Sequence, residues 1–309
     1  NWTGLTTEGV RQGPPFYTDD DWGLDQHIAW KQQSVIGFVF QDPWLADDDT
    51  DIEYLYLHLI QQHDALHLSP AQIAQGWVQH MNDAIWGDSP ARRWMEWGAM
   101  PPVTGMGPVN DNYLMNNAQL VTEVFGALAP GMPDQALRLA DLPIRAVSAG
   151  YSAHAAQFHI VLYSLATQVD PEQSRRAQLL WLVDQARQYL PDTSKAADVV
   201  DFVVADYLEN PDGDDWERTR DHIYARYQRD ARDYGFVYRG WLESSVNFAT
   251  GLMALLYGEG DYRRTVQIGT LSGWDSDNGT ATMGGLLGLM FGYEALAAEF
   301  PGVALSDRY

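Results

Sequence analysis

The fold is indicated most directly by residues 47–63, which read DDDTDIEYLYLHLIQQH. The apolar residues of this stretch recur at the three- and four-residue spacing of one α-helical face. They are Ile52, Leu55, Tyr56 and Leu59. Thr50, followed three residues later by Glu53, matches a capping box. We therefore expect a helix that begins at the acidic run.

The same period continues along the chain. Ser69 and Pro70 form an N-cap followed by proline at the first helical position, which predicts a second helix to about Trp86. Residues 87–112 are rich in Gly and Pro and are expected to be loop, while residues 35–41 could form a short strand. Further helices are expected at 113–128, 133–148, 151–168, 171–189, 195–208, 214–233, 241–257 and 279–298. The pattern predicts an all-α fold, a compact orthogonal helical bundle.

Length and composition limit the possible functions. The 309 residues show no internal repeat and no shift in composition, so we expect a single domain over 1–309. The formal net charge of -23 disfavours binding to a nucleic acid backbone or to an anionic membrane. The chain has no cysteine, which excludes disulfides, thiolate nucleophiles and cysteine-bound metals.

The acidic run Asp47-Asp48-Asp49 has two interpretations. Carboxylates are favourable near the positive end of a helix dipole, so the run could simply cap the helix. Three consecutive carboxylates also repel one another unless a cation lies among them, and Mg²⁺ or Mn²⁺ prefers such oxygen ligands. The residues alone leave both interpretations open.

A second acidic motif, Asp275-Ser276-Asp277, precedes a glycine-rich helix. By itself the motif could be a surface turn. Gly284, Gly288 and Gly292 repeat every four residues behind it, and glycine costs roughly 1 kcal/mol in a helix interior. We therefore expect another backbone to pack closely against this stripe, giving a rigid helix that could hold a cation at its start.

Other polar residues give weaker signals. His154 and His159 lie on an apolar helix, and we expect at least one of them to be an ordinary core histidine. The charged stretch from Glu217 to Arg232 is expected to be a solvated helix face. Its arginines are Arg218, Arg220, Arg226 and Arg229, with Arg232 at the end of the stretch. No zinc-protease motif, nucleophile elbow or dinucleotide-binding fingerprint is present.

Taken as an ordered pair, the two acidic motifs resemble the signature of the ADP-ribosylglycohydrolase family, which includes the dinitrogenase reductase-activating glycohydrolases. That family has an early Thr-Asp-Asp-Thr motif and a late Gly-x-Asp-x-Asp motif that opens a glycine-rich helix. Here they read Asp47-Asp48-Asp49-Thr50 and Gly273-Trp274-Asp275-Ser276-Asp277. Residues 4–9 are also similar to the end of the family's first helix, and residues 129–133 and 247–258 resemble its bacterial branch.

The resemblance implies an all-α fold with two divalent cations, Mg²⁺ or Mn²⁺, at the bottom of a cleft. By position it implies a set of metal ligands, a carboxylate that transfers the proton, and a loop that lines the substrate cleft. The metal ligands would be Asp48, Asp49, Asp275 and Asp277, with Asp47 and Asn278 as further oxygen donors. The catalytic carboxylate would be Glu8 or one of Asp47 to Asp49, and the substrate loop would be Gly105-Met106-Gly107.

Two positions depart from the family pattern. Asp47 stands where the family has threonine, and Asn278 stands where it has threonine or serine. Both departures retain an oxygen donor, so they bear on the substrate more than on the metal. The activity implied is hydrolysis of an N- or O-glycosidic bond at C1 of an ADP-ribose-like or ribosyl group.

Two alternatives stay open. The first is a binuclear-metal glycosidase acting on a neutral furanoside or nucleoside, and the second is a protein that binds metal or ADP-ribose without turnover. The partner is expected to be a small molecule or an ADP-ribosylated substrate. The resemblance also places most of the family's first helix before Asn1. We expect the cytoplasm as the compartment and leave secretion and the oligomeric state open.

Overall fold

The structure, a computed structural model, describes residues 40, 42–44, 48–81, 88–210, 212–306 and 308. These residues form helices and connecting segments and contain no β-strand, so the all-α prediction is confirmed. The strand expected at residues 35–41 lies, apart from Phe40, outside the described residues.

The described chain divides into two compact units. The N-terminal unit comprises residues 46–169 and 182–197, and the C-terminal unit comprises 170–181 and 198–309 with the described residues of 1–45. This division does not test whether residues 1–309 form a single domain, which stays a prediction.

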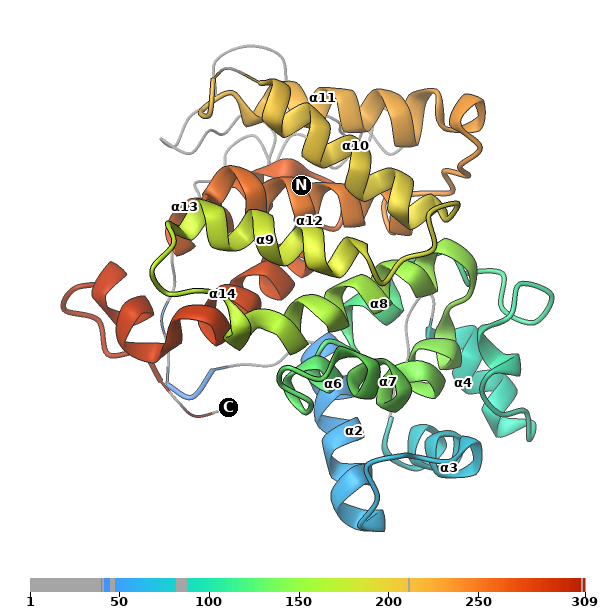
Figure 1. Ribbon diagram of the computed structural model, residues 1–309. Helices are drawn as coiled ribbons and strands as arrows, with labels where there is room; N and C mark the ends of the chain where they lie inside the picture. Colours follow the sequence, from blue (N-terminus) through green and yellow to red (C-terminus); the bar gives the residue numbers. More distant parts are fainter. Residues whose placement is uncertain are drawn as a thin grey trace. The chain divides into compact units, whose positions relative to one another are not determined.

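The N-terminal unit consists of short and medium helices (Figure 1). They are α2 (Asp48–His63), α3 (Pro70–His80), α4 (Asp88–Glu96), η3 (Val103–Gly105), α5 (Asn117–Leu120), α6 (Val124–Ala127), α7 (Pro133–Val147), α8 (Gly150–Leu165) and η4 (Ala166–Gln168). Their apolar faces meet in one core, where the rings of Tyr56 and Phe125 pack edge to face with centroids 5.5 Å apart. The apolar face predicted for residues 52–59 is therefore the face that α2 buries.

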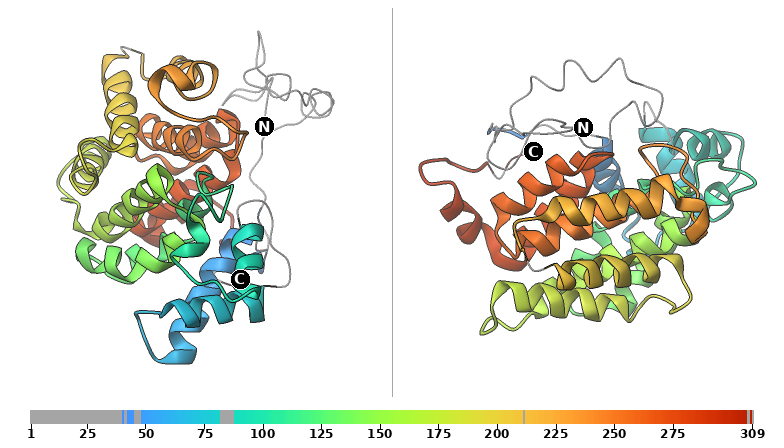
Figure 2. Two further views of the ribbon diagram at one scale, coloured as in Figure 1. Left: turned by 90° about the vertical axis from the view of Figure 1, so that its right-hand side faces the viewer. Right: turned by 90° about the horizontal axis from the view of Figure 1, so that it is seen from above.

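Helix α3 begins as its sequence predicts. The Ser69 hydroxyl accepts a hydrogen bond from the Gln72 backbone N–H, and the Gln72 side chain accepts one from Ser69 N–H. Pro70 follows at the first helical position. The helix ends at His80 rather than near Trp86, and it packs beside α2, as Figure 2 shows in cyan and blue.

Two further predictions in this unit are wrong, at the starts of α2 and α4. Helix α2 is already formed at Asp48, so Thr50 lies inside it and is not its N-cap, and Glu53 accepts a hydrogen bond from the Val124 N–H of α6. The region expected to be loop contains α4, which tolerates Pro90 because it lies in the first turn.

The helix expected at 113–128 is replaced by the single turns α5 and α6. Thr122 lies between them, where its hydroxyl donates to the Ala118 carbonyl and its backbone N–H donates to the Glu123 carboxylate. These side-chain hydrogen bonds occupy backbone groups that would otherwise bond to each other in a continuous helix.

The C-terminal unit contains α14, the longest helix of the described chain, and several shorter ones. They are α11 (Trp216–Tyr224), the π-helical turn η5 (Ala225–Arg229), η6 (Ala231–Tyr234), α12 (Ser244–Gly258), α13 (Tyr262–Ser272) and α14 (Ser276–Glu299). Helices α9 (Arg175–Arg187) and α10 (Lys195–Glu209) have residues in both units. Every residue of α12 is buried, as expected for a helix that is apolar all round, and α12 packs against α13 and α14.

Helix α13 was not expected from the sequence. Its N-cap is Asp261, whose carboxylate accepts the Arg264 backbone N–H at 2.8 Å. Its interior contains β-branched residues and Gly269, which are poor helix formers. Burial of residues such as Thr265 and Ile268 against α12 and α14 compensates for that weak propensity.

The charged stretch from Glu217 to Arg232 is not a uniform solvated face. Arg220 is only 1 % exposed and binds Asp221 and Glu217. Arg226 pairs with Asp198 at 2.8 Å and lies over the rings of three aromatic residues. Those residues are Phe202, Tyr227 and Tyr234. The prediction is wrong for these two arginines because apolar and aromatic groups cover their stems.

The prediction for the glycine stripe of α14 is also wrong. A Cβ at Gly284 would meet the Tyr262 ring at 3.4 Å, one at Gly288 would meet only the Leu296 side chain, and Gly292 has open space and φ of 79°. The close backbone approach occurs one turn earlier, where a Cβ at Gly279 would meet Gly251 Cα of α12 at 3.6 Å.

By length and composition alone, α14 could cross a membrane, and it is the one helix in the described ranges of which this is true. Core helices pass the same test. Its helical geometry breaks at Gly292, and its first half packs along α12 and α13. The buried residues of α14 all lie before Gly288, and residues 288–299 are half-buried or exposed.

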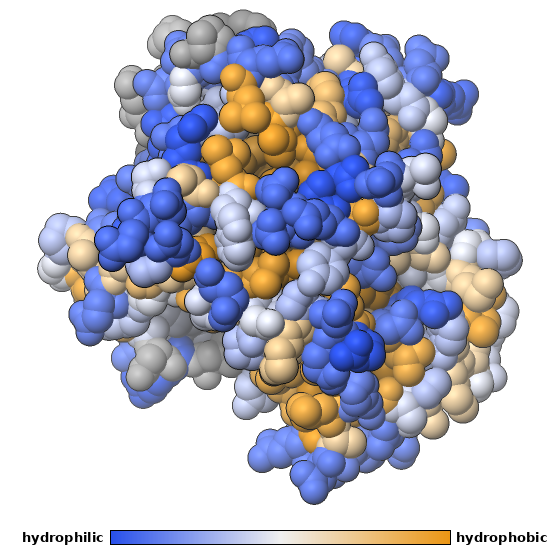
Figure 3. All heavy atoms as spheres, viewed as in Figure 1, coloured by the Kyte–Doolittle hydropathy of each residue, from blue (hydrophilic) through white to orange (hydrophobic). Residues whose placement is uncertain are grey.

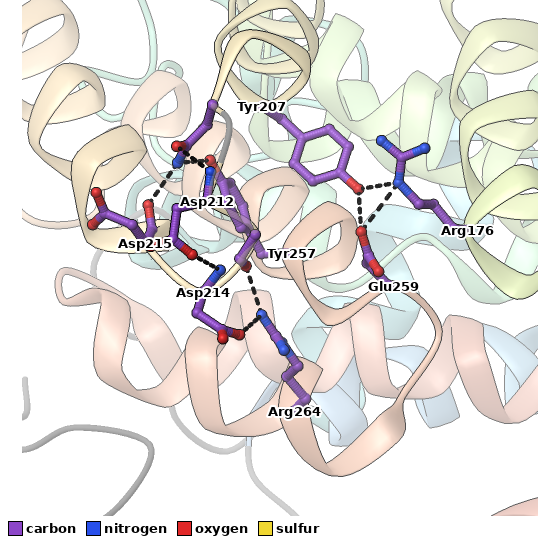
Figure 4. Close-up of polar contacts among 10 residues, drawn as sticks. Arg176, Tyr207, Asp212, Asp214, Asp215, Tyr257, Glu259 and Arg264 are labelled. Atoms are coloured by element: carbon purple, nitrogen blue, oxygen red, sulfur yellow. Dashed lines mark hydrogen bonds and ion pairs between the residues drawn. The ribbon is translucent and has the colours of Figure 1, made fainter.

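Arginines fix two connections of the C-terminal unit (Figure 4). Arg264 donates to the Gly213 carbonyl at 2.6 Å and pairs with Asp214, which anchors the acidic loop before α11. Arg176 donates to Glu259 and to the hydroxyl of Tyr207, which itself donates to Glu259 at 2.7 Å.

The surface is mixed in character. On the face in Figure 3, hydrophobic residues gather where α10 and α11 lie, between hydrophilic ones. Leu208 of α10, for example, is 55 % exposed. Single exposed apolar residues of this kind are normal on folded proteins.

Candidate metal centre

The late acidic motif lies on a turn with unusual backbone geometry between α13 and α14. Gly273 has φ of 100° and Trp274 has φ of 54°. A bulky residue rarely adopts the left-handed region, and holding it there costs about 1–3 kcal/mol. Such strain is typical of functional sites, because neighbouring contacts must maintain it.

Two side chains hold this turn. The buried indole of Trp274 donates its Nε1–H to Gln228 Oε1 at 2.7 Å. The backbone N–H of Asp275 donates to Asn247 Oδ1 at 3.0 Å. The Asn247 amide is fixed in turn, since its Nδ2 donates to the carbonyls of Trp241 and Glu243.

Asp275 is the buried acid of the site. It is the N-cap residue of α14 and is 4 % exposed. The positive end of the helix dipole favours its carboxylate. Its Oδ2 accepts a hydrogen bond from Asn278 Nδ2 at 2.5 Å, so one of its oxygens already has a donor.

Asp277 and Asn278 complete the first turn of α14. Asp277 is exposed, whereas Asn278 is half-buried. The structure thus brings the predicted residues Asp275, Asp277 and Asn278 into one turn. It also gives Asn278 a role that the sequence did not indicate, as a donor to the Asp275 carboxylate.

The early acidic motif forms the start of α2 in the N-terminal unit. Asp48 is the first described residue of the helix, although its side chain lies outside the described atoms, and Asp49 is half-buried. Asp47 and Glu8 lie outside the described residues. Because the two motifs belong to different units, their union in one binuclear site stays a prediction.

The predicted substrate loop is a tight structural turn. A Cβ at Gly105 would lie 2.4 Å from the Arg145 carbonyl oxygen, and one at Gly107 would lie 2.9 Å from the Tyr113 ring. Close packing within the N-terminal unit therefore explains both glycines. Met106 between them is 45 % exposed and is the side chain of this loop that presents itself to solvent.

The donor chemistry fits a hard divalent cation. Carboxylate and amide oxygens at both helix starts are the ligands that Mg²⁺ and Mn²⁺ prefer. Within the described ranges, no group of three or more acidic or histidine side chains could hold a metal ion. The side chains of Glu8, Asp47 and Asp48 lie outside these ranges.

The two histidines singled out in the sequence belong to α8 of the N-terminal unit. His159 is buried in α8 with its Nδ1 3.1 Å from the Gln119 carbonyl oxygen, and burial lowers its pKa to about 4. Burial also lowers the pKa of the half-buried His154. The prediction of a core histidine is confirmed for His159.

The two residues that hold the Asp275 turn, Gln228 and Asn247, were not expected from the sequence. The stretch from Asn247 resembled the family, but nothing in it indicated a bond to Asp275. Gln228 gave no signal, because its position depends on a π-helical turn that no periodicity predicts.

Comparison with known proteins gives the family. The model of the ADP-ribosylglycohydrolase family, described as ADP-ribosylglycohydrolase, matches residues 2–303. The chain therefore belongs to the ADP-ribosylglycohydrolase family, and the all-α fold is consistent with it. The match does not resolve the branch. Searches of curated proteins and of solved structures gave no match.

Proposed function

We propose that this chain is a hydrolase that cleaves a glycosidic bond at C1 of an ADP-ribose-like or ribosyl group, with two Mg²⁺ or Mn²⁺ ions as cofactors. Family membership over residues 2–303 supports the reaction class. The observation that carries the proposal is the buried carboxylate of Asp275 at the start of α14. It directly follows Trp274, whose backbone has the left-handed conformation. A strained turn that presents a buried acid is more typical of a site than of a surface connection.

The residues that would hold the cations come from the two acidic motifs. They are Asp48, Asp49, Asp275 and Asp277, with Asp47 and Asn278 as further donors. When bound, the ions would act as Lewis acids that orient the sugar's vicinal hydroxyls and a water molecule. Asp275 is suited to this role because its position is fixed through Asn247 before any ligand arrives.

Proton transfer is assigned to a carboxylate. Glu8 is one candidate, and Asp47, Asp48 and Asp49 are the others, acting as general acid or base. Cleavage at C1 would pass through an oxocarbenium-like transition state, as in other glycosyl hydrolysis. The loop Gly105-Met106-Gly107 would contact the substrate through Met106, which is its exposed side chain.

The test is a substrate panel with and without metal. ADP-ribosylated arginine and serine peptides are compared with nitrophenyl furanosides in Mg²⁺, in Mn²⁺ and in excess chelator. The proposal predicts turnover of the ADP-ribosyl peptides that the chelator abolishes and that Asp275→Asn lowers. Metal binding without turnover of any substrate would show a binding protein and would overturn the proposal.

A second candidate is hydrolysis of a neutral furanoside or nucleoside. The net charge of -23 favours it, because a pyrophosphate would be repelled outside the immediate field of the metals. Asp47 adds a further negative charge at the predicted site. Turnover confined to the furanosides of the panel would select this candidate.

A further inference from the structure

We propose that Gln228 is a positioning residue for Asp275, acting through Trp274. This inference rests on the proposed function, since Asp275 must bind a cation for its position to matter. Gln228 accepts the indole N–H of Trp274, and its effect on Asp275 passes through that ring.

The first step is the connection itself. Trp274 and Asp275 are consecutive, so the backbone torsions of the tryptophan set the direction in which Asp275 enters α14. The indole is fully buried, and its single donor, Nε1–H, bonds to Gln228 Oε1 at 2.7 Å. Loss of that acceptor would break a buried hydrogen bond and would remove a constraint on the left-handed turn.

The second step is the local structure that positions the Gln228 side chain. It lies in the π-helical turn Ala225–Arg229, where the Asp230 N–H bonds to the Ala225 carbonyl five residues earlier at 2.9 Å. A π turn inserts a residue relative to an α-helix and changes the direction of the side chains that follow. Tyr227 anchors this turn, since its buried ring packs edge to face on Phe236.

The third step is that Gln228 and Asn247 bind different groups of the turn. Asn247, on α12, accepts the backbone N–H of Asp275, whereas Gln228 accepts the indole N–H of Trp274. Gly273 before it has φ of 100° and adds no side chain to restrain the turn. Gln228 and Asn247 thus constrain two different parts of the turn.

The test distinguishes the effect of the Gln228 acceptor oxygen from the effect of the size of its side chain. Gln228→Met keeps the length but removes the acceptor, whereas Gln228→Glu retains an acceptor oxygen. Mn²⁺ affinity is measured by calorimetry for both variants and the wild type, with the exposed Gln173→Met in the same unit as a control. The Trp274 indole N–H resonance, assigned by its absence in Trp274→Phe, reports the bond directly.

The expected result is a loss of roughly 10-fold in Mn²⁺ affinity for Gln228→Met, with a shifted indole resonance, recovery in Gln228→Glu and no change in the control. Wild-type affinity in Gln228→Met despite the shifted resonance would overturn the inference and leave the proposed function intact. Equal losses in both variants would also overturn it.

Two further outcomes are distinguishable. If Gln228→Met does not fold, Trp274→Phe removes the same bond from the donor side and is expected to show the same loss of affinity. If the wild type binds no Mn²⁺, the proposed function fails first, and this inference falls with it.

Discussion

At the scale of single residues, the chemistry of the candidate site centres on one hydrogen bond. The side-chain amide of Asn278 donates a hydrogen bond to Asp275 Oδ2 at 2.5 Å. Asn278 stands where the family pattern has threonine or serine. Hydrogen bonds to charged groups contribute about 1.5–3 kcal/mol, so the amide competes with a cation for that oxygen.

Replacing this donor should therefore strengthen metal binding. We expect Asn278→Thr to raise Mn²⁺ affinity by roughly 10-fold, because a competing bond of about 1.4 kcal/mol or more is lost. Calorimetric titration of the variant beside the wild type measures the change. Because threonine keeps an oxygen donor at this position, unchanged or weaker binding would show that the Asn278 amide N–H does not compete with the cation.

A second prediction at this scale concerns His159. Its pKa is lowered by burial to about 4, whereas in the unfolded chain it is about 6.5. Between these values the unfolded chain binds a proton that the folded chain does not. The stabilisation from neutral His159 is complete above about pH 6.5 and is lost as the pH falls towards 4.

The measurement is the free energy of unfolding from pH 7 to pH 5 for the wild type and for His159→Asn, which keeps a donor near Gln119 but does not titrate. The wild type should lose roughly 2 kcal/mol more than the variant over this interval. Parallel curves would show that His159 has an ordinary pKa in the fold.

At the scale of elements, helix packing explains what periodicity could not. Helices α7, α8, α10 and α12 were predicted nearly to their ends, since their apolar faces are continuous. Helix α13 was missed because its sequence favours a helix only when α12 and α14 cover it. The sequence predicted one helix in place of the single turns α5 and α6, because a hydropathy pattern does not reveal the hydrogen bonds of Thr122.

The contact between α13 and α14 gives a paired test. A Cβ at Gly269 would lie 2.3 Å from Thr280 Oγ1, whose hydroxyl bonds to the Ser276 carbonyl. A Cβ at Gly279 would meet its nearest neighbour, Gly251 Cα, at an ordinary 3.6 Å. We expect Gly269→Ala to destabilise by about 1–2 kcal/mol, since overpacking exceeds the gain in helix propensity.

Gly279→Ala is the matched control for this contact. It should be neutral or stabilise by at most about 1 kcal/mol, because alanine favours the helix. Denaturant unfolding of both variants supplies the comparison. Equal stabilities would show that Gly269 does not face Thr280 closely.

At the scale of the whole molecule, charge is the dominant property. Asp and Glu outnumber Lys and Arg by 42 to 19, which gives the net charge of -23. The class of fold and the family followed from helical periodicity and from two short motifs in order. The turn that holds Asp275 could not be predicted, because Trp274 at positive φ and Gln228 on a π turn are set by tertiary contacts.

Charge also predicts a salt dependence that distinguishes substrates. For an ADP-ribosyl substrate, kcat/KM should rise as NaCl increases from about 20 to 200 mM, since salt screens repulsion beyond a Debye length of about 10 Å. A neutral furanoside should show little change. A fall in kcat/KM with salt for the ADP-ribosyl substrate would indicate a locally positive approach to the site.

The central claim is that Asp275 and Asp277 help to bind divalent cations. Calorimetric titration of Mn²⁺ into the wild type, Asp275→Ala and Asp277→Ala tests it most directly, with Asp192→Ala as a control because Asp192 is an exposed acid of the N-terminal unit. We predict binding by the wild type and the control, and a loss of at least about 10-fold in affinity for Asp275→Ala, with a smaller loss for the exposed Asp277→Ala. Undiminished binding in both site variants would contradict the account.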